Sequence, residues 1–310
     1  MNRFAIGTDI GGSHISCALI GLNEKTLLSE SIRSQQVNNQ ASADEILESW
    51  CIALKKTMNQ VKREDLAGIG FAMPGPFDYA KGIALFTKDV AKYENLHGVD
   101  VADELSGRLG LQQEQFRFIN DASAFAVGEA WMGKASKVSR SLSITLGTGF
   151  GSAFIDKGLL VVDREDVPRM GCVWHLPYRD GIADDYFSTR WFIRRFAEIT
   201  GKNVRGVKEI AIMASTDKTA RDIFAEFGSN LGEFLGYWLK RFGADMLVIG
   251  GNVSCAYPLF SRAFESVLKD QNIPSQIEIS ELMESSAMAG SAHLFIESFW
   301  FHVKPLLSKM

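Results

Sequence analysis

The sequence predicts an α/β protein that contains two copies of a similar set of strands and helices. Along the first third of the chain, short apolar runs alternate with segments whose apolar residues recur at helical spacing. Two pairs of predicted strands are each joined by a glycine-bearing turn, at residues 11–13 and 147–151, and the order of elements starts again at the second turn. We therefore predict an internal duplication, with one half near residues 1–120 and the other near 121–290. The alternative is that two unrelated strand pairs both turn at glycines.

The first half contains the following predicted elements. Ser42 and Glu45 have the spacing of a capping box, and apolar residues at helical spacing continue from there to Met58, which predicts an amphipathic helix. A short helix is expected at 101–108 and another, strongly apolar, at 124–131. Strands are expected at residues 4–8, 15–20, 26–32, 66–72 and 115–120.

The second half repeats this order with longer helices. Strands are expected at 141–146, 151–155, 246–249 and 276–279. One face of a long helix is traced by apolar residues from Phe224 to Phe242, and further helices are expected at 256–268 and 285–301.

Length and composition limit the class of protein. A chain of 310 residues has room for about two domains. Its 33 basic and 37 acidic residues give a formal net charge of -4 without a basic block, so no nucleic-acid partner is expected. No apolar stretch approaches the roughly 18 residues that span a bilayer. The four cysteines are widely spaced and contain no C-x-x-C pair, which favours a reducing compartment. We expect a cytoplasmic protein without a membrane partner.

The two glycine turns are candidate phosphate-binding sites. Glycines in a turn let backbone N–H groups approach an anion, and Asp9 next to the first turn can hold a hydrated Mg²⁺. The second turn is not a dinucleotide-binding fingerprint, because Phe154 and Ile155 continue a strand where that fingerprint requires a helix. It also lacks the G-K-[ST] of a P-loop. Two such hairpins, one from each half, are predicted to hold a nucleotide in a cleft between the domains.

Asn120 and Asp121 lie where a predicted strand ends and an apolar helix begins. A carboxylate at a helix N-terminus is stabilised as the anion, so Asp121 is expected to be ionised near neutral pH. It is therefore a candidate base for the proton of an attacking hydroxyl. The alternative is that Asp121 only caps the helix.

Several segments together resemble the ROK family of sugar kinases in order and spacing. They are residues 9–13 (DIGGS), 68–70 (GIG) with 74–76 (PGP), 120–122 (NDA), 146–151 (LGTGFG), 249–254 (IGGNVS) and 289–292 (AGSA). The resemblance implies an actin-like or hexokinase-like ATPase fold of the ribonuclease H-like type, with two duplicated α/β domains and ATP in the cleft between them. It assigns 1–120 and a C-terminal helix at 291–310 to a small domain, and 121–290 to a larger one.

The resemblance also implies roles for individual residues in phosphoryl transfer from ATP to a sugar hydroxyl. Asp121 would be the base. Asp9 would serve Mg²⁺ through water. The remaining assignments are Gly11, Gly12, Ser13 and His14 at the β- and γ-phosphates, Gly147, Thr148, Gly149 and Gly151 on the other side of the triphosphate, Gly250, Gly251 and Asn252 at the adenosine, and Asn120, Gly75, Thr87 and Asn95 at the sugar.

The sugar site departs from the family pattern. Members usually carry G-E-x-G-H, followed by a cysteine cluster for zinc, whereas residues 171–175 here read GCVWH and 176–185 contain no cysteine. Because a structural zinc needs four ligands, none is expected. Cys172 replaces a sugar-binding glutamate, and a buried sugar hydroxyl left without a partner costs roughly 1–3 kcal/mol. His175 either bonds a sugar hydroxyl or is structural, Trp174 either stacks on a sugar or is core, and Asp184 aligns with the second sugar-binding carboxylate.

Two functional hypotheses follow. The first is an ATP-dependent and Mg²⁺-dependent kinase for a sugar or amino sugar, expected by family resemblance to form dimers or tetramers. The second is a sugar-binding sensor without catalysis. Regulators in the family carry an N-terminal helix-turn-helix domain, and the first phosphate strand here is predicted from residue 4, which disfavours DNA binding. Other ATPases of the same fold would lack the Asn120–Asp121 pair and the 171–188 segment.

Overall fold

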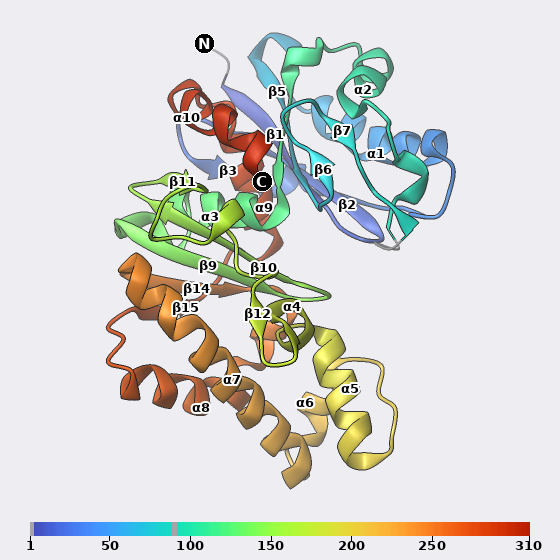
Figure 1. The fold of residues 1–310 in the computed structure, drawn as a ribbon. Helices are drawn as coiled ribbons and strands as arrows, with labels where there is room; N and C mark the ends of the chain where they lie inside the picture. Colours follow the sequence, from blue (N-terminus) through green and yellow to red (C-terminus); the bar gives the residue numbers. More distant parts are fainter. Residues whose placement is uncertain (1–2, 89–91) are drawn as a thin grey trace. The chain divides into compact units, whose positions relative to one another are not determined.

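The computed structural model describes residues 3–88 and 92–310. Internal contacts divide the chain into two compact units (Figure 1). Unit 1 comprises Met1–Ser136, Gly158–Leu160 and Leu282–Met310, and unit 2 comprises Lys137–Lys157 and Val161–Glu281. The sequence-based boundary after residue 120 falls elsewhere, because these contacts place helix α3 (Asp121–Trp131) in unit 1.

The sheet of unit 1 brings the ends of three strands to one edge. β1 (Phe4–Ile10) and β2 (His14–Gly21) form an antiparallel hairpin, and β5 (Leu66–Met73) and β8 (Phe116–Asn120) follow in parallel, which gives the order β3-β2-β1-β5-β8. Asp9 is in register with Ala72, and Ala72 with Ile119. The sheet therefore places Asp9 at the same edge as the end of β8. The smaller strands are β3 (Thr26–Leu27) and β4 (Arg33–Gln36), which pair with β2, and the hairpin of β6 (Phe77–Asp78) and β7 (Ile83–Ala84).

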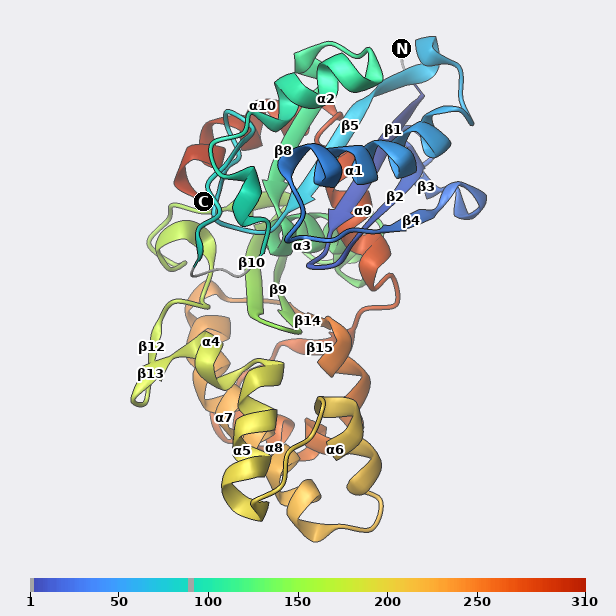
Figure 2. The same cartoon turned by 90° about the vertical axis from the view of Figure 1, so that its right-hand side faces the viewer.

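Helix α1 (Ala43–Met58) covers one face of this sheet, as the turned view in Figure 2 shows. The predicted capping box is present, with the Ser42 hydroxyl accepting from the N–H of Glu45 and the Glu45 carboxylate accepting from the N–H of Ser42. Trp50 of α1 is fully buried, and its ring lies 6.3 Å from that of Phe71 in β5. Helix α2 (Val101–Leu109) packs against α1 and ends at Gly110.

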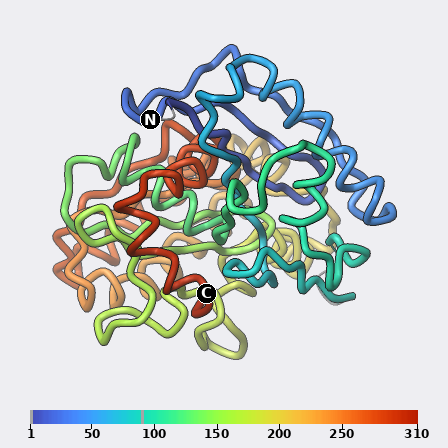
Figure 3. Tube along the Cα trace, turned by 90° about the horizontal axis from the view of Figure 1, so that it is seen from above, coloured from blue at the N-terminus to red at the C-terminus, as the bar shows by residue number. Residues whose placement is uncertain are grey.

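The opposite face of the sheet is covered by α9 (Glu284–His293), which packs on β1 and β5 and against α3. A Cβ atom at Gly7 would lie 1.8 Å from the carbonyl oxygen of Met288, and one at Gly70 would lie 2.0 Å from that of Ser291. The Ser291 hydroxyl also bonds both the N–H and the carbonyl of Thr8, each at 3.0 Å. The red carboxy-terminal segment thus covers one face of the sheet that contains the blue amino-terminal strands (Figure 3).

The second sheet has the same strand order as the first. β9 (Arg140–Leu146) and β10 (Phe150–Asp156) form an antiparallel hairpin, and β14 (Met246–Gly250) and β15 (Gln276–Ile279) follow in parallel, giving β11-β10-β9-β14-β15 with β11 (Leu159–Val161) at the edge. This correspondence confirms the predicted duplicated α/β fold. The strands β12 (Pro177–Tyr178) and β13 (Gly181–Ile182) form a separate hairpin.

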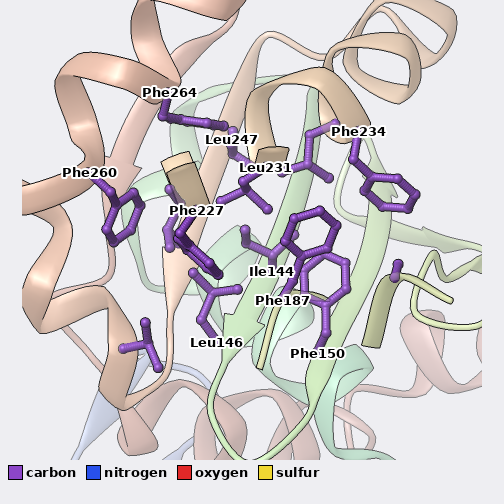
Figure 4. Close-up of a cluster of buried hydrophobic side chains, with 14 of the residues drawn as sticks. Ile144, Leu146, Phe150, Phe187, Phe227, Leu231, Phe234, Leu247, Phe260 and Phe264 are labelled. Carbon is purple, nitrogen blue, oxygen red and sulfur yellow. The ribbon is translucent and has the colours of Figure 1, made fainter. Parts of the chain in front are cut away.

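Aromatic side chains fill the core between this sheet and the helices of unit 2 (Figure 4). Phe227 and Leu231 of α7 (Lys218–Phe242) are fully buried, as is Phe260 of α8 (Tyr257–Asp270). The two helices approach so closely that a Cβ atom at Gly228 would lie 2.4 Å from the carbonyl oxygen of Phe260. The other helices of the unit are α4 (Ala183–Tyr186), α5 (Thr189–Thr200) and α6 (Val207–Met213).

Two predicted elements differ from the structure. The strand expected at 26–32 is interrupted after Leu27, because the Ser31 hydroxyl rather than a strand partner binds the N–H of Leu19 at 2.8 Å. The helix expected at 285–301 is two helices, α9 and α10 (Glu297–Val303). Within the described ranges, no helix is long and apolar enough to cross a membrane.

Candidate active site

The first glycine turn joins β1 to β2 in unit 1. The N–H of Gly11 donates to the carbonyl of His14 at 2.9 Å, and the side chain of Ser13 is exposed. Gly12 is partly exposed, and the amide of Asn39 donates to its carbonyl. The predicted phosphate-binding residues of this turn therefore lie together at the end of the hairpin.

Three carboxylates gather beside this turn. Burial, with the negative charges of Asp121 and Glu284, raises the pKa of Asp9 from 3.8 to about 7. Glu284 also lies 3.9 Å from Nε2 of His14. Carboxylate oxygens are the ligands that Mg²⁺ prefers, and a cation would relieve the repulsion among these groups. A role of Asp9 in holding Mg²⁺ stays a prediction.

Asn120 and Asp121 lie where β8 meets α3, and Asn120 rather than Asp121 is the helix N-cap. The Asn120 side chain accepts from the N–H of Ser123 at 3.1 Å and donates to Oδ1 of Asp121 at 2.9 Å and to the hydroxyl of Tyr79 at 3.2 Å. Oδ1 of Asp121 also accepts from the N–H of Ala122 at 2.8 Å. The carboxylate of Asp121 is thus held in a fixed orientation without serving as the cap.

The ionisation of Asp121 depends on desolvation as well as on the helix N-terminus, which the sequence-based expectation did not include. Burial raises the pKa of Asp121, whereas the N–H of Ala122, the charge of Lys92 and the amide of Asn120 lower it. The balance is a raised pKa. A carboxyl group with a raised pKa is a stronger base than an exposed aspartate, provided that it is ionised.

The loop from β5 to α2 carries the other predicted sugar contacts. Gly75 and Thr87 are exposed. Asn95 is exposed too, and its amide donates to the carbonyls of Gln40 and Ala41 at 3.1 and 2.8 Å. These bonds fasten one loop to another, so the side-chain donor of Asn95 is already engaged. Sugar contact by these three residues stays a prediction.

The same loop supplies two residues that the sequence did not single out. The hydroxyl of the fully buried Tyr93 donates to the carbonyl of Gly11 at 2.7 Å. The preceding residue, Lys92, lies against Gly12 and contributes positive charge near Asp121. Neither belongs to a strand or helix pattern, so no local signal marks them.

The second glycine turn joins β9 to β10 in unit 2. The N–H of Gly147 donates to the carbonyl of Gly149 at 3.0 Å, and the side chain of Thr148 is exposed. Oδ1 of Asp184 accepts from the N–H of Phe150 at 2.6 Å, and Oδ2 of the same carboxylate pairs with Arg190. The predicted sugar ligand Asp184 is therefore bound to the glycine turn.

The predicted adenosine residues follow β14. Gly250 is buried and in register with Thr145 of β9, which also pairs with Gly151 on its other side. Gly251 has a φ of +79°, and a Cβ atom there would lie 2.4 Å from the carbonyl oxygen of Leu146. Asn252 is exposed. The three residues thus lie next to the second glycine turn within unit 2.

In the segment 171–175, which departs from the family pattern, the side chains of Cys172 and His175 favour their uncharged forms. Sγ of Cys172 lies 3.8 Å from Nδ1 of His175, and burial raises the pKa of the thiol to about 11. Burial and the charge of Arg169 lower the pKa of His175. The side chain of Trp174 is 40% exposed, so it is not a core residue of unit 2. In the described part of the chain, no three His, Cys, Asp or Glu side chains are arranged to hold a metal.

Two sheets of one strand order, each with a glycine turn after its first strand, define a duplicated α/β protein. A model of the family described as the ROK family matches residues 5–298, so the chain belongs to the ROK family. A glucokinase from Thermotoga maritima is 25% identical over 321 residues, covering 94% of this chain and 97% of that protein. An N-acetyl-D-glucosamine kinase from Haemophilus influenzae is 24% identical over 320 residues, covering 94% and 98%.

Solved structures give the same fold. A ROK hexokinase from Thermus thermophilus has a TM-score of 0.76 at 20% identity, with 97% of this chain and 99% of that chain covered. A ROK family glucokinase from Streptomyces griseus, solved with glucose and AMPPNP, has a TM-score of 0.72 at 23% identity, with 94% and 98% covered. The predicted actin-like ATPase fold and the predicted class, a ROK-type sugar kinase, are thereby confirmed.

Proposed function

We propose that the protein transfers the γ-phosphoryl group of ATP to a hydroxyl of a sugar or amino sugar, with Asp121 as the general base. The observation that carries this proposal is the carboxylate of Asp121, which is partly buried and is oriented by Asn120 and Ala122 at the sheet edge that also bears Asp9. A fixed, desolvated carboxylate is the group that an attacking hydroxyl needs, and the named relatives are kinases for glucose and N-acetylglucosamine.

In the proposed reaction, the sugar hydroxyl oxygen attacks the γ-phosphorus and forms the new O–P bond. The bond from the γ-phosphorus to the bridging oxygen breaks, and ADP leaves with the electron pair. Asp121 accepts the hydroxyl proton and later passes it to water. Because such a transfer passes through a loose transition state, positioning and charge neutralisation supply most of the rate.

The proposal places the phosphates at the two glycine turns. Backbone N–H groups of Gly11 and Gly12 in unit 1, and of Gly147 and Gly149 in unit 2, would bind phosphate oxygens. Mg²⁺, held through water by Asp9, would neutralise phosphate charge when bound. The family likeness supports this assignment.

The segment from Cys172 to Asp184 bears on which sugars the protein binds. The partly buried thiol of Cys172 has a raised pKa and is neutral, so it offers no anionic acceptor to a hydroxyl. Asp184 already accepts from Phe150 and pairs with Arg190. We propose that neutral groups, including His175, replace the usual carboxylates, so that affinity for an unmodified hexose is low.

The experiment is a panel of hexoses, N-acetylhexosamines and other amino sugars with Mg²⁺ and ATP, followed by Asp121→Asn. General base catalysis contributes about 10²–10⁴ in rate, so kcat should fall by that factor while ATP affinity is kept. Asp44→Asn is the matched control, since Asp44 is likewise in the first turn of a helix but is exposed. Unchanged turnover in Asp121→Asn, or no turnover of any sugar by the wild-type protein, overturns the proposal.

The same panel tests the sensor hypothesis, which predicts sugar binding without turnover. A homo-oligomer, a cytoplasmic location and the lack of nucleic-acid and membrane partners stay predictions. Analytical ultracentrifugation of the purified protein measures the first of these.

A further inference from the structure

The segment Lys92–Tyr93 is held against the first glycine turn. The ring of Tyr93 is fully buried, 5.7 Å from the rings of both Trp50 and Phe86. Its hydroxyl donates to the carbonyl of Gly11 at 2.7 Å. Tyr93 has a φ of +54°, a left-handed conformation that is unfavourable for a non-glycine residue and that these contacts hold in place. Tyr93 therefore fixes the position of its neighbour Lys92.

The Lys92 side chain lies along Gly12. From the position that a Cβ atom would take at Gly12, Cε of Lys92 is 3.3 Å away and Nζ is 3.8 Å away. Lys92 is partly buried, and its charge lowers the pKa of Asp121. Within the described chain, its ammonium forms no ion pair within 4.0 Å. The ammonium group of a partly buried lysine that forms no ion pair can bind an incoming anion.

A positive charge beside the first glycine turn would favour the binding of a phosphate there. Backbone N–H groups supply only partial charges, and Asp9, Asp121 and Glu284 add negative charge at the same end of the sheet. A triphosphate approaching this turn therefore meets repulsion that an ammonium at Lys92 offsets.

We propose that Lys92 is a phosphate-binding residue that contacts the terminal phosphate of a nucleoside triphosphate over Gly11 and Gly12, and that Tyr93 is the positioning residue that holds it there. This inference rests on the proposed function for the identity of the anion. The contact is a charge-assisted hydrogen bond from Nζ to a phosphate oxygen.

The test compares binding of AMPPNP, ADP and adenosine, each with Mg²⁺ and without sugar, by calorimetry. In Lys92→Met, which keeps the chain length and removes the charge, affinity for AMPPNP should fall about 10-fold or more while adenosine affinity is unchanged. Lys92→Arg should restore most of the AMPPNP affinity. Lys88→Met is the matched control, because Lys88 is an exposed lysine of the same loop that lies 3.9 Å from Glu94.

Tyr93→Phe removes only the hydrogen bond to Gly11 and should give a smaller loss of AMPPNP affinity, again without a change for adenosine. Thermal unfolding of each variant checks that the fold is kept. AMPPNP binding by Lys92→Met within twofold of wild type overturns the inference, as does a wild-type protein that binds AMPPNP no better than adenosine. If the wild-type protein binds AMPPNP but phosphorylates no sugar, the proposed function fails while this inference stands.

Discussion

The carboxylate of Asp184 accepts a hydrogen bond from the backbone N–H of Phe150 at 2.6 Å and pairs through its other oxygen with Arg190. Asp184 occupies the position that family resemblance gives to a sugar-binding carboxylate. In this chain the side chain also holds the second glycine turn, so one residue links the altered sugar segment to a predicted phosphate site within unit 2.

Asp184→Ala should therefore change nucleotide use more than sugar use. The N–H of Phe150 loses its partner, which costs about 1–3 kcal/mol, and the turn loosens. We expect KM for ATP to rise at least 5-fold with a smaller change in KM for the sugar, measured by steady-state kinetics. Asp180→Ala removes an exposed carboxylate from the same segment and is the control. A rise confined to KM for the sugar would show that Asp184 is a sugar ligand after all.

Asp9→Asn should stabilise the protein while impairing its activity. The folded-state pKa of Asp9, about 7, is above its ordinary value of 3.8, so this group contributes stability below pH 4 that is lost as the pH rises through 7. A difference of one unit between the folded-state and unfolded-state pKa corresponds to about 1.4 kcal/mol. The Asp9→Asn variant should therefore have a free energy of unfolding at pH 8 that is higher by roughly 1–3 kcal/mol. Urea denaturation at pH 5 and pH 8 measures it. An equal effect at both pH values would contradict the prediction.

His293 should make unit 1 sensitive to acid. Burial between Trp131 and Phe299, aided by the charge of Lys25, lowers the pKa of His293 from 6.5 to about 3. Its contribution to stability is fully present above pH 6.5 and is lost as the pH falls toward 3, with a slope of up to about 1.4 kcal/mol per pH unit. His293→Phe should flatten the pH dependence of unfolding between pH 6.5 and 4.5. His302→Phe, on the exposed end of α10, should leave it unchanged.

Two glycine-to-alanine changes in helices should have opposite signs. At Gly228 of α7, the added Cβ atom would meet the carbonyl oxygen of Phe260 at 2.4 Å, so α7 and α8 must separate at a cost of about 1–3 kcal/mol. At Gly107 of α2, nothing lies within 4 Å, so alanine should stabilise the helix by about 0.5–1 kcal/mol. Thermal unfolding of both variants checks this pair, and a stabilised Gly228→Ala would mean that the helices are not in contact at this point.

The sequence predicts the elements that carry their own periodicity. The strand at 276–279 has the bounds that the structure gives β15, and the capping box at Ser42 is present. The single helix expected at 285–301 is two helices in the structure, because the apolar residues of this segment pack against two different parts of unit 1. Those of α9 face the sheet, whereas Phe295 and Trp300 beyond its end flank the guanidinium of Arg117 at 4.7 and 4.4 Å. Periodicity alone does not separate these two uses.

The sequence predicts those parts of the candidate site that are formed by backbone turns. It does not predict the side chains that join the site from other parts of the chain. The glycine turns follow from composition at strand ends. Asn120 and Asp121 are both good capping residues, so their order does not reveal which one caps α3. Lys92, Tyr93 and Arg190 reach their partners only in the folded chain, and no spacing in the sequence connects Tyr93 with Gly11.

The bond between Ser291 and Thr8 joins positions 283 residues apart, so it can form only after residue 291 has been synthesised. The strands of the first sheet up to β8 are translated first, yet the glycine-lined face of this sheet lacks α9 until residues 284–293 leave the ribosome. Unit 2 lies almost wholly between these segments and is released whole before then. At about 5–20 residues per second, the passage from residue 136 to residue 291 takes roughly 10–30 s. During that interval the unfinished face of the first sheet is open to chaperones and to other nascent chains.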